Sequence, residues 1–118
     1  MITVCMATYN GEKYIEEQLE SVLMQLHSND EVIISDDGSG DSTVDLIRTF
    51  NDPRIRLLVG NNFFSPIQNF ENALKYAKGD YIFLCDQDDV WLPDKVERML
   101  QYLLQYDLVV SGCKVGGA

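Results

Sequence analysis

Three carboxylates follow directly on an apolar run in the second half of the chain. Residues 81–85 (YIFLC) are apolar or aromatic, and Asp86, Asp88 and Asp89 come within the next four positions. Carboxylates this close repel one another unless a positive charge lies between them, so a divalent metal ion is a natural partner. Hard oxygen ligands suit Mg2+ or Mn2+, which often hold substrate phosphates as well. A solvated acidic turn explains the same residues, because Asp is common in turns, and the cluster alone leaves both interpretations open.

The elements that would position this cluster are short apolar segments alternating with amphipathic ones. The expected strands are residues 2–7, 31–35, 55–59, 81–85 and 108–111. Strands separated by helices imply right-handed crossovers and a buried, parallel sheet. We therefore expect an α/β fold with an open, mostly parallel sheet and helices on both faces. Residues 1–118 should form a single domain, truncated on its C-terminal side.

The first two helices are expected before and after the second strand. The first carries an apolar face made of Ile15, Leu19, Val22, Leu23 and Leu26. The second begins near Ser42, which has capping-box spacing to Asp45, and runs to about Phe50.

The third and fourth helices flank the acidic cluster. The third has an apolar face made of Ile67, Phe70, Leu74 and Ala77. It should stop at Lys78 and Gly79, where glycine can adopt the left-handed conformation of a helix end. The fourth should begin at Pro93, a favoured first helical residue, and Trp91 before it is expected to be exposed, free to stack on a sugar or to pack on that helix.

Composition and charge limit the classes of function. The 118 residues are 46% hydrophobic, enough for one domain with a real core. A formal net charge of −10 argues against binding nucleic acid or anionic lipid. The sequence shows no apolar stretch of membrane-spanning length and no signal peptide pattern. We expect a cytoplasmic chain, with any contact to the inner face of the membrane made by parts outside it.

The cysteines and the one histidine do not point to catalysis. Cys5, Cys85 and Cys113 lie in or beside apolar runs without the paired spacing of a zinc site, which is typical of core residues in a reducing compartment. His27 follows a helical pattern, so a surface helix end is expected. A single histidine argues against a zinc hydrolase or a Ser-His-Asp triad.

Polar loops follow four of the expected strands. Ligands of open parallel sheets bind outside the carboxyl ends of the strands, so these loops should meet at one site. The loops contain Thr8, Tyr9, Asn10 and Glu12; Asp36 and Asp37; Asn61 and Asn62; and the acidic cluster. Turn chemistry explains each loop alone, but their convergence favours a ligand site.

Three spaced motifs resemble those of family 2 glycosyltransferases. They are residues 4–10 (VCMATYN), 32–39 (VIISDDGS) and 79–89 (GDYIFLCDQDD). The resemblance covers nearly the whole chain, and residues 86–95 (DQDDVWLPDK) resemble members that build bacterial surface polysaccharides, including rhamnosyltransferase-like ones. It implies a GT-A fold, a UDP- or dTDP-sugar donor, Mn2+ or Mg2+, and inverting transfer to the hydroxyl of a glycan or lipid-linked acceptor.

The resemblance also implies roles for residues in these motifs. Thr8 and Tyr9 would line the nucleobase pocket. Asp36 or Asp37 would accept a hydrogen bond from the base imide or the ribose. Other residues expected at the nucleotide-sugar site are Asn10, Glu12, Asn69, Asp86 and Gln87.

The metal corner and the general base are expected in different places. The family's Asp-x-Asp signature falls on Asp86 and Asp88, with Asp86 near the ribose and Asp88 on the metal ion. The base that activates the acceptor normally follows the fifth strand in this family, so we expect it outside the chain, which would then be inactive alone. Asp89 and Asp94 are weaker substitutes, because Asp89 could support the loop and Asp94 suits the first turn of a helix.

Two alternatives stay open beside this hypothesis. A nucleotidyltransferase of related fold would bind a nucleoside triphosphate, although residues 6–11 contain no Lys or Arg to grip it. A metal-dependent nucleotide-binding module without catalysis is the other. A response-regulator receiver fits less well, because its acidic pair follows the first strand, where this chain has Thr8, Tyr9 and Asn10.

Overall fold

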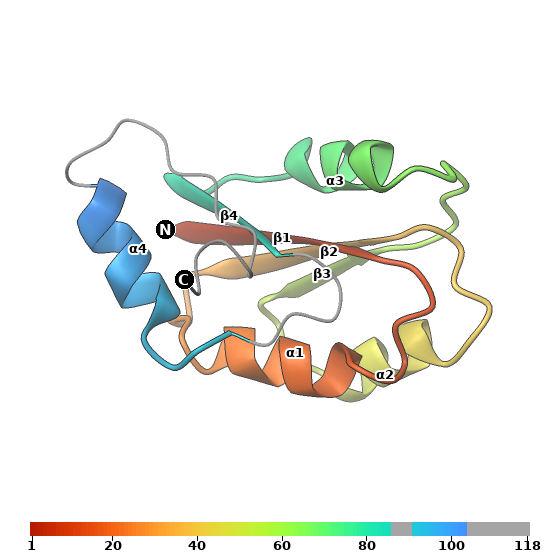
Figure 1. The fold of residues 1–118 in the computed structure, drawn as a ribbon, viewed down its shortest axis with the longest axis horizontal. Helices are drawn as coiled ribbons and strands as arrows, with labels where there is room; N and C mark the ends of the chain where they lie inside the picture. The colour runs from red at the N-terminus through yellow and green to blue at the C-terminus, as the bar shows by residue number, and fades with distance from the viewer. Residues whose placement is uncertain (86–90, 104–118) are drawn as a thin grey trace.

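The computed structural model describes residues 1–85 and 91–103 of the chain (Figure 1). Strands and helices alternate strictly along this part, as the sequence predicted. In order they are β1 (Ile2–Thr8), α1 (Ile15–Leu23), β2 (Glu31–Asp36), α2 (Thr43–Thr49), β3 (Ile55–Leu58), α3 (Pro66–Leu74), β4 (Tyr81–Cys85) and α4 (Lys95–Leu103). The strand predicted at 108–111 lies outside the described residues.

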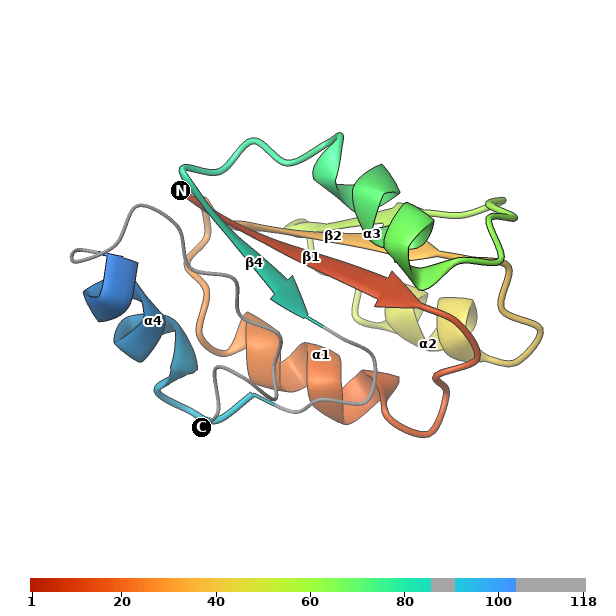
Figure 2. The same ribbon diagram turned by 45° about the horizontal axis from the view of Figure 1, so that its top comes forward.

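The four described strands form one parallel sheet in the order β3-β2-β1-β4. The chain moves outward from β1 through β2 to β3 and then returns to the other side of β1 for β4. Because such crossovers are right-handed, this reversal puts the connecting helices on opposite faces. Figures 1 and 2 show α1 and α2 on one face and α3 on the other. The predicted α/β fold with helices on both faces is confirmed.

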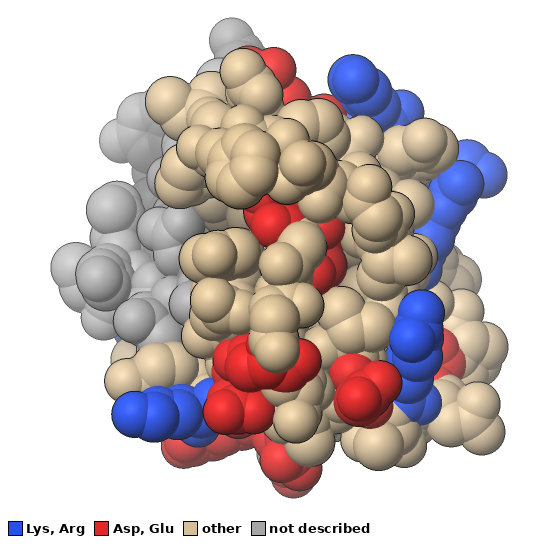
Figure 3. Space-filling view, turned by 90° about the vertical axis from the view of Figure 1, so that its right-hand side faces the viewer, with Lys and Arg blue, Asp and Glu red and all other residues tan. Residues whose placement is uncertain are grey.

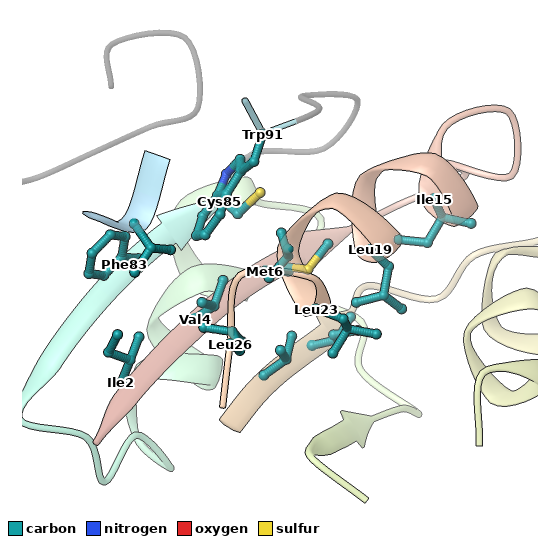
Figure 4. Close-up of a cluster of buried hydrophobic side chains, with 14 of the residues drawn as sticks. Ile2, Val4, Met6, Ile15, Leu19, Leu23, Leu26, Phe83, Cys85 and Trp91 are labelled. Carbon is teal, nitrogen blue, oxygen red and sulfur yellow. The ribbon is translucent and has the colours of Figure 1, made fainter. Parts of the chain in front are cut away.

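The main core lies between α1 and the face of the sheet that this helix covers (Figure 4). Every residue of β1 is buried, as expected of a central strand covered on both sides. Its side chains alternate between the two faces, so Val4 and Met6 join the main core while Cys5 joins a smaller cluster with Ile33 and Ala73 under α3. Cys5 and Cys85 are buried free thiols, as predicted, and Cys113 lies outside the described residues.

Helix α1 buries the apolar face predicted for it but is shorter than expected. It ends at Leu23, and Leu26 is buried in the following turn. The guanidinium of Arg54 donates to the carbonyl oxygens of Leu23 and Leu26, both at 3.0 Å. These bonds satisfy carbonyl groups that lack partners at the end of the helix, so the side chain of Arg54, just before β3, caps the C-terminus of α1. His27 is exposed in this turn.

The capping box predicted for α2 is absent. Ser42 makes no side-chain cap bond, because its backbone (φ −84°, ψ 11°) is not in the extended conformation that a cap requires. The Asp41 carboxylate instead accepts the amide hydrogen of Thr43 at 3.0 Å.

Helix α3 packs on the sheet with a face that the sequence pattern did not predict. Asn69 and Ala73 are buried, whereas Ile67 is 71% exposed and Leu74 is 38% exposed. Polar groups of β1 and β2 lie beneath the helix, and the Asn69 amide donates to the carbonyl of Thr8 at 3.3 Å. The Asn69 amide therefore faces the sheet. The prediction that Ile67 and Leu74 belong to the buried face was wrong.

The end of α3 also differs from the prediction. The helix ends at Leu74, and Gly79 is not among the described residues with left-handed backbone. A Cβ at Gly79 would lie 2.6 Å from both the backbone nitrogen and Oγ1 of Thr3. Glycine is needed here because the chain passes close to β1, not because a helix ends.

Helix α4 begins at Lys95 rather than at Pro93, which lies in the preceding turn. Strand β3 ends at Leu58, one residue before the predicted limit. Within the ranges 1–85 and 91–103, no helix is both long and apolar enough to cross a membrane.

Candidate nucleotide-sugar site

The strand order places a site at the carboxyl ends of β1 and its neighbours. In open α/β sheets, ligands bind where the strand order reverses, which here is beside β1. Figure 3 views the molecule from this end and shows acidic atoms in a hollow in the middle of the face and more of them along its lower part. The residues predicted for the first two loops lie here.

Thr8 and Asp36 are directly paired across the ends of β1 and β2. The Thr8 hydroxyl donates to Oδ1 of Asp36 at 2.7 Å, and the side chains are 1% and 2% exposed. The same carboxylate accepts hydrogen bonds from the backbone nitrogen and hydroxyl of Ser39, at 2.9 and 2.6 Å. Gly38 allows this tight turn, because its φ of +78° is disfavoured for other residues. Asp36 therefore holds the loop after β2 against β1.

Asp37 joins the same loop to the segment before α3. Its Oδ1 accepts the amide hydrogen of Phe63 at 2.6 Å, and its Oδ2 accepts that of Ser65 at 3.2 Å. Its own amide donates to the carbonyl of Thr8 at 3.0 Å. The side chain is 8% exposed, so it reaches the surface slightly more than Asp36 does.

Asn69, expected at the nucleotide-sugar site, lies on α3 beside the end of β1. Its amide nitrogen donates to the carbonyl of Thr8, while its Oδ1 is buried and accepts no hydrogen bond within the described part of the chain. Buried polar atoms nearly always have partners, so this open acceptor is the feature that keeps Asn69 a candidate site residue.

The loop after β1 carries one exposed ring and two residues that fasten it. Tyr9 is 54% exposed at the edge of the site. Asn10, at φ +49°, bonds through its Oδ1 to the amide of Gly40 at 2.8 Å. Glu12 accepts the amide hydrogen of Ser42 at 3.0 Å. Asn10 and Glu12 thus connect the loop after β1 to the loop after β2, a role that their sequence positions did not reveal.

The predicted metal corner falls outside the described residues. Strand β4 runs beside β1 and ends at Cys85, so the chain leaves the sheet at this edge toward Asp86, Gln87 and Asp88. Among residues 1–85 and 91–103, no group of three or more His, Cys, Asp or Glu side chains could hold a metal ion. Asp36 and Asp37 accept hydrogen bonds from backbone amides and hydroxyls.

Trp91 is buried, so the expected exposure was wrong, and the alternative of packing beside the fourth helix is the one that fits. It is 3% exposed, and its ring centroid lies 5.8 Å from that of Phe83 in the main core (Figure 4). The ammonium of Lys95, itself 2% exposed, lies 5.4 Å from the same ring. Packing against β4 and α4 therefore excludes the predicted exposed position, and Trp91 offers no surface for stacking on a sugar.

Comparison with solved structures defines the class of fold. The Staphylococcus aureus protein TarS, residues 1–349 in complex with UDP-GlcNAc, superposes with a TM-score of 0.79 at 27% identity, over 90% of this chain and 32% of that one. The mannosyltransferase PcManGT from Pyrobaculum calidifontis, in complex with GDP-Man and Mn2+, gives 0.78 at 27% identity, over 86% and 32%. The predicted GT-A class of fold is confirmed.

Sequence comparison gives the family. The family model described as glycosyl transferase family 2 matches residues 3–117, so the chain belongs to glycosyl transferase family 2. It is 33% identical over 108 residues to the Escherichia coli UDP-Glc:alpha-D-GlcNAc-diphosphoundecaprenol beta-1,3-glucosyltransferase WfgD, covering 92% of this chain and 43% of that protein. It is 38% identical over 106 residues to the Shigella flexneri dTDP-rhamnosyl transferase RfbG, covering 84% and 37%. The chain thus spans less than half the length of these relatives.

Proposed function

We propose that this chain is the nucleotide-sugar-binding part of a glycosyltransferase that acts in the synthesis of bacterial cell-surface polysaccharide. The observation that carries the proposal is the Thr8–Asp36 pair at the carboxyl ends of β1 and β2, next to the point where the strand order reverses, with Asp37 and Asn69 nearby. The names of the relatives support the choice of donor, because they include a UDP-glucose-dependent enzyme and a dTDP-rhamnosyl transferase. UDP and dTDP share a pyrimidine base with an imide group.

Asp37 is the better candidate to accept a hydrogen bond from that imide. A carboxylate oxygen has two lone pairs. Oδ1 of Asp36 already accepts bonds from Thr8 and Ser39, and its Oδ2 accepts the amide hydrogen of Ser39, so Asp36 keeps one lone pair in all. Each oxygen of Asp37 accepts one backbone bond and keeps one lone pair. The exposed ring of Tyr9 could stack on the base, since base–aromatic stacking needs only a free π-face.

The reaction proposed for the full-length protein is an inverting transfer. The oxygen of the acceptor hydroxyl forms a bond to the anomeric carbon, and the bond from that carbon to the diphosphate breaks on the opposite side. The proton of the hydroxyl passes to a general base outside this chain. A divalent ion on Asp86 and Asp88, when bound, would supply positive charge to the leaving nucleoside diphosphate.

The acceptor and location belong to the same proposal. We propose a glycan or lipid-linked acceptor, consistent with the diphosphoundecaprenol in the name of WfgD. The chain would act in the cytoplasm, and parts of a longer protein would bring it to the inner face of the membrane.

Calorimetric titration of the folded chain with UDP, dTDP and GDP, with and without Mn2+, tests this function. We expect UDP or dTDP to bind more tightly when Mn2+ is present and GDP to bind weakly. Asp37→Asn should lower pyrimidine nucleotide affinity, and Asp88→Ala should remove the effect of Mn2+. Asp45→Asn, an exposed carboxylate on α2, is the matched control and should change neither. No nucleotide binding by a folded sample, or an unchanged Mn2+ effect in Asp88→Ala, would contradict the proposal.

A further inference from the structure

Three polar side chains form a row along α1 and the turn after it. Gln18, Ser21 and Gln25 recur at the spacing of one helical face. Gln18 is fully buried, although glutamine is rarely found without exposure. The remaining buried positions of α1 are apolar and face the main core. A polar row beside an apolar core needs specific partners, and the described hydrogen bonds show where they are.

One end of the row contacts the residue that precedes the acidic segment. The amide nitrogen of Gln18 donates to Sγ of Cys85 at 3.4 Å. Cys85 is the last residue of β4, and Asp86 follows it directly. Gln18 therefore fixes the point where the chain leaves the sheet.

The rest of the row contacts the residues that follow the acidic segment. Ser21 Oγ accepts the amide hydrogen of Trp91 at 2.9 Å. Gln25 donates to the carbonyl of Leu92 at 2.6 Å and accepts the amide hydrogen of Val96 at 2.9 Å. Two side chains thus hold three backbone groups within six residues, which is a much denser anchoring than a surface turn requires.

Trp91 and Lys95 strengthen the same anchor. The indole packs on Phe83 of β4, so the two sides of the acidic segment also meet through a ring contact of 5.8 Å. Lys95 buries its ammonium beside that ring. A cation over an aromatic face adds a favourable contact, so Lys95 helps to hold Trp91 in place.

We infer that Ser21 and Gln25 are positioning residues for the acidic segment 86–89, acting through Trp91, Leu92 and Val96. This rests on the proposed function, in which that segment holds the diphosphate of the donor. A site built on a loop binds well only if its ends are fixed in advance, because otherwise the ligand must supply the energy of ordering them. The contacts that would supply this order join α1 and the turn after it to residues 91–96.

Hydrogen exchange of the full chain tests the anchor without a ligand. In Ser21→Ala/Gln25→Met, amide exchange in peptides spanning 84–96 should rise by at least about tenfold, because the amide hydrogens of Trp91 and Val96 lose their acceptors. Peptides of β1 and β2 should keep their wild-type rates. Ser28→Ala/Gln101→Met, two exposed positions, is the matched control and should match the wild type throughout. Unchanged exchange across 84–96 would overturn the inference.

Nucleotide affinity then shows whether the anchor matters for the site. The double variant should bind UDP about tenfold more weakly, by the same loss of order, while Ser21→Thr, which keeps a hydroxyl acceptor, should bind like the wild type. Faster exchange with unchanged affinity would overturn the positioning role. If the wild type itself binds no nucleotide, the proposed function fails, and exchange still decides whether α1 holds the segment. Should the double variant unfold, Gln25→Glu keeps the acceptor for Val96 and removes the donor to Leu92, so the same comparison applies.

Discussion

The Thr8 hydroxyl and the Asp36 carboxylate are joined by a buried 2.7 Å hydrogen bond across the ends of the two central strands. This bond connects the fold to the site, because Asp36 also shapes the loop that carries Asp37. A charged acceptor bonded to a hydroxyl in a buried setting contributes more than a neutral pair does.

Thr8→Val should therefore destabilise the chain by about 2 kcal/mol, because it leaves the buried Asp36 carboxylate without one donor at nearly unchanged volume. Urea unfolding followed by circular dichroism measures the change. Thr8→Ser keeps the hydroxyl and should lose less stability than Thr8→Val. Equal stabilities for Thr8→Val and the wild type would show that Ser39 alone satisfies the carboxylate.

The capping of α1 by Arg54 leads to a second prediction. Arg54→Met keeps the aliphatic stem but removes the donors to Leu23, Leu26 and Asp52, so we expect a loss of about 2–3 kcal/mol in the free energy of unfolding. The free energy of unfolding of Arg54→Lys should lie between those of the wild type and Arg54→Met, since an ammonium cannot reproduce the planar fork of the guanidinium. The control is Arg48→Met, an exposed position on α2. A similar loss in both Met variants would argue against a specific cap.

Stability at acidic pH depends on the ion pair between Arg54 and Asp52. The hydrogen bond from Arg54 lowers the pKa of Asp52 from its ordinary 3.8 in the folded chain. A lowered folded pKa means that this contribution is present above pH 3.8 and is lost as the pH falls through the folded value. Asp52→Asn should thus be less stable than the wild type at pH 7, and the difference should shrink as the pH falls below about 4. A difference that stays constant from pH 7 to pH 3 would refute this linkage.

Gly79→Ala tests the close approach of the chain to β1. The added methyl group would lie 2.6 Å from the backbone nitrogen of Thr3, which cannot move without disturbing the sheet. Overpacking of this kind costs about 1–3 kcal/mol. At Gly40 a Cβ would meet nothing within 4 Å, so Gly40→Ala should be close to neutral. The two thermal midpoints, measured side by side, should differ by several degrees for a domain of this size.

Cys5 should resist thiol reagents in the folded chain. Burial, with a smaller effect from Glu31, raises the pKa of its thiol from 9.0 to about 12, so almost no thiolate forms at pH 8. Iodoacetamide labelling followed by peptide mass analysis should modify Cys5 only after urea is added. Rapid labelling of Cys5 under native conditions would mean that the smaller core under α3 opens readily.

The sequence predicted the sheet well because of how parallel strands are buried. Phe83 and Cys85 of β4 join the main core and Leu84 packs on the smaller cluster, so the strand needs apolar side chains on both faces, and the limits 81–85 were predicted correctly. The same reasoning brought Thr8 and Asp36 to one edge, and their pairing confirms it. The ends of the other described strands were predicted to within one residue, because β1 and β2 end one residue later, at Thr8 and Asp36, and β3 one residue earlier, at Leu58.

The sequence did not predict features that depend on contacts with other parts of the chain. An amphipathic pattern shows that α3 has two sides, but only the polar groups of β1 and β2 explain why Asn69 rather than Ile67 faces inward. The burial of Trp91 depends likewise on Phe83 and on Ser21, which are far from it in sequence. The sequence pattern left Trp91 open between an exposed ring and a ring packed on the fourth helix, and these contacts decide between the two.

Trp91 is the chain's single tryptophan, and it lies two residues beyond the last aspartate of the acidic segment. Its indole is shielded from water and fixed between a helix and a strand. The intrinsic fluorescence of the protein is therefore dominated by one ring next to the place where we expect the diphosphate to bind. The unlabelled chain carries its own optical probe, and donor arrival could be followed in real time by a change in emission.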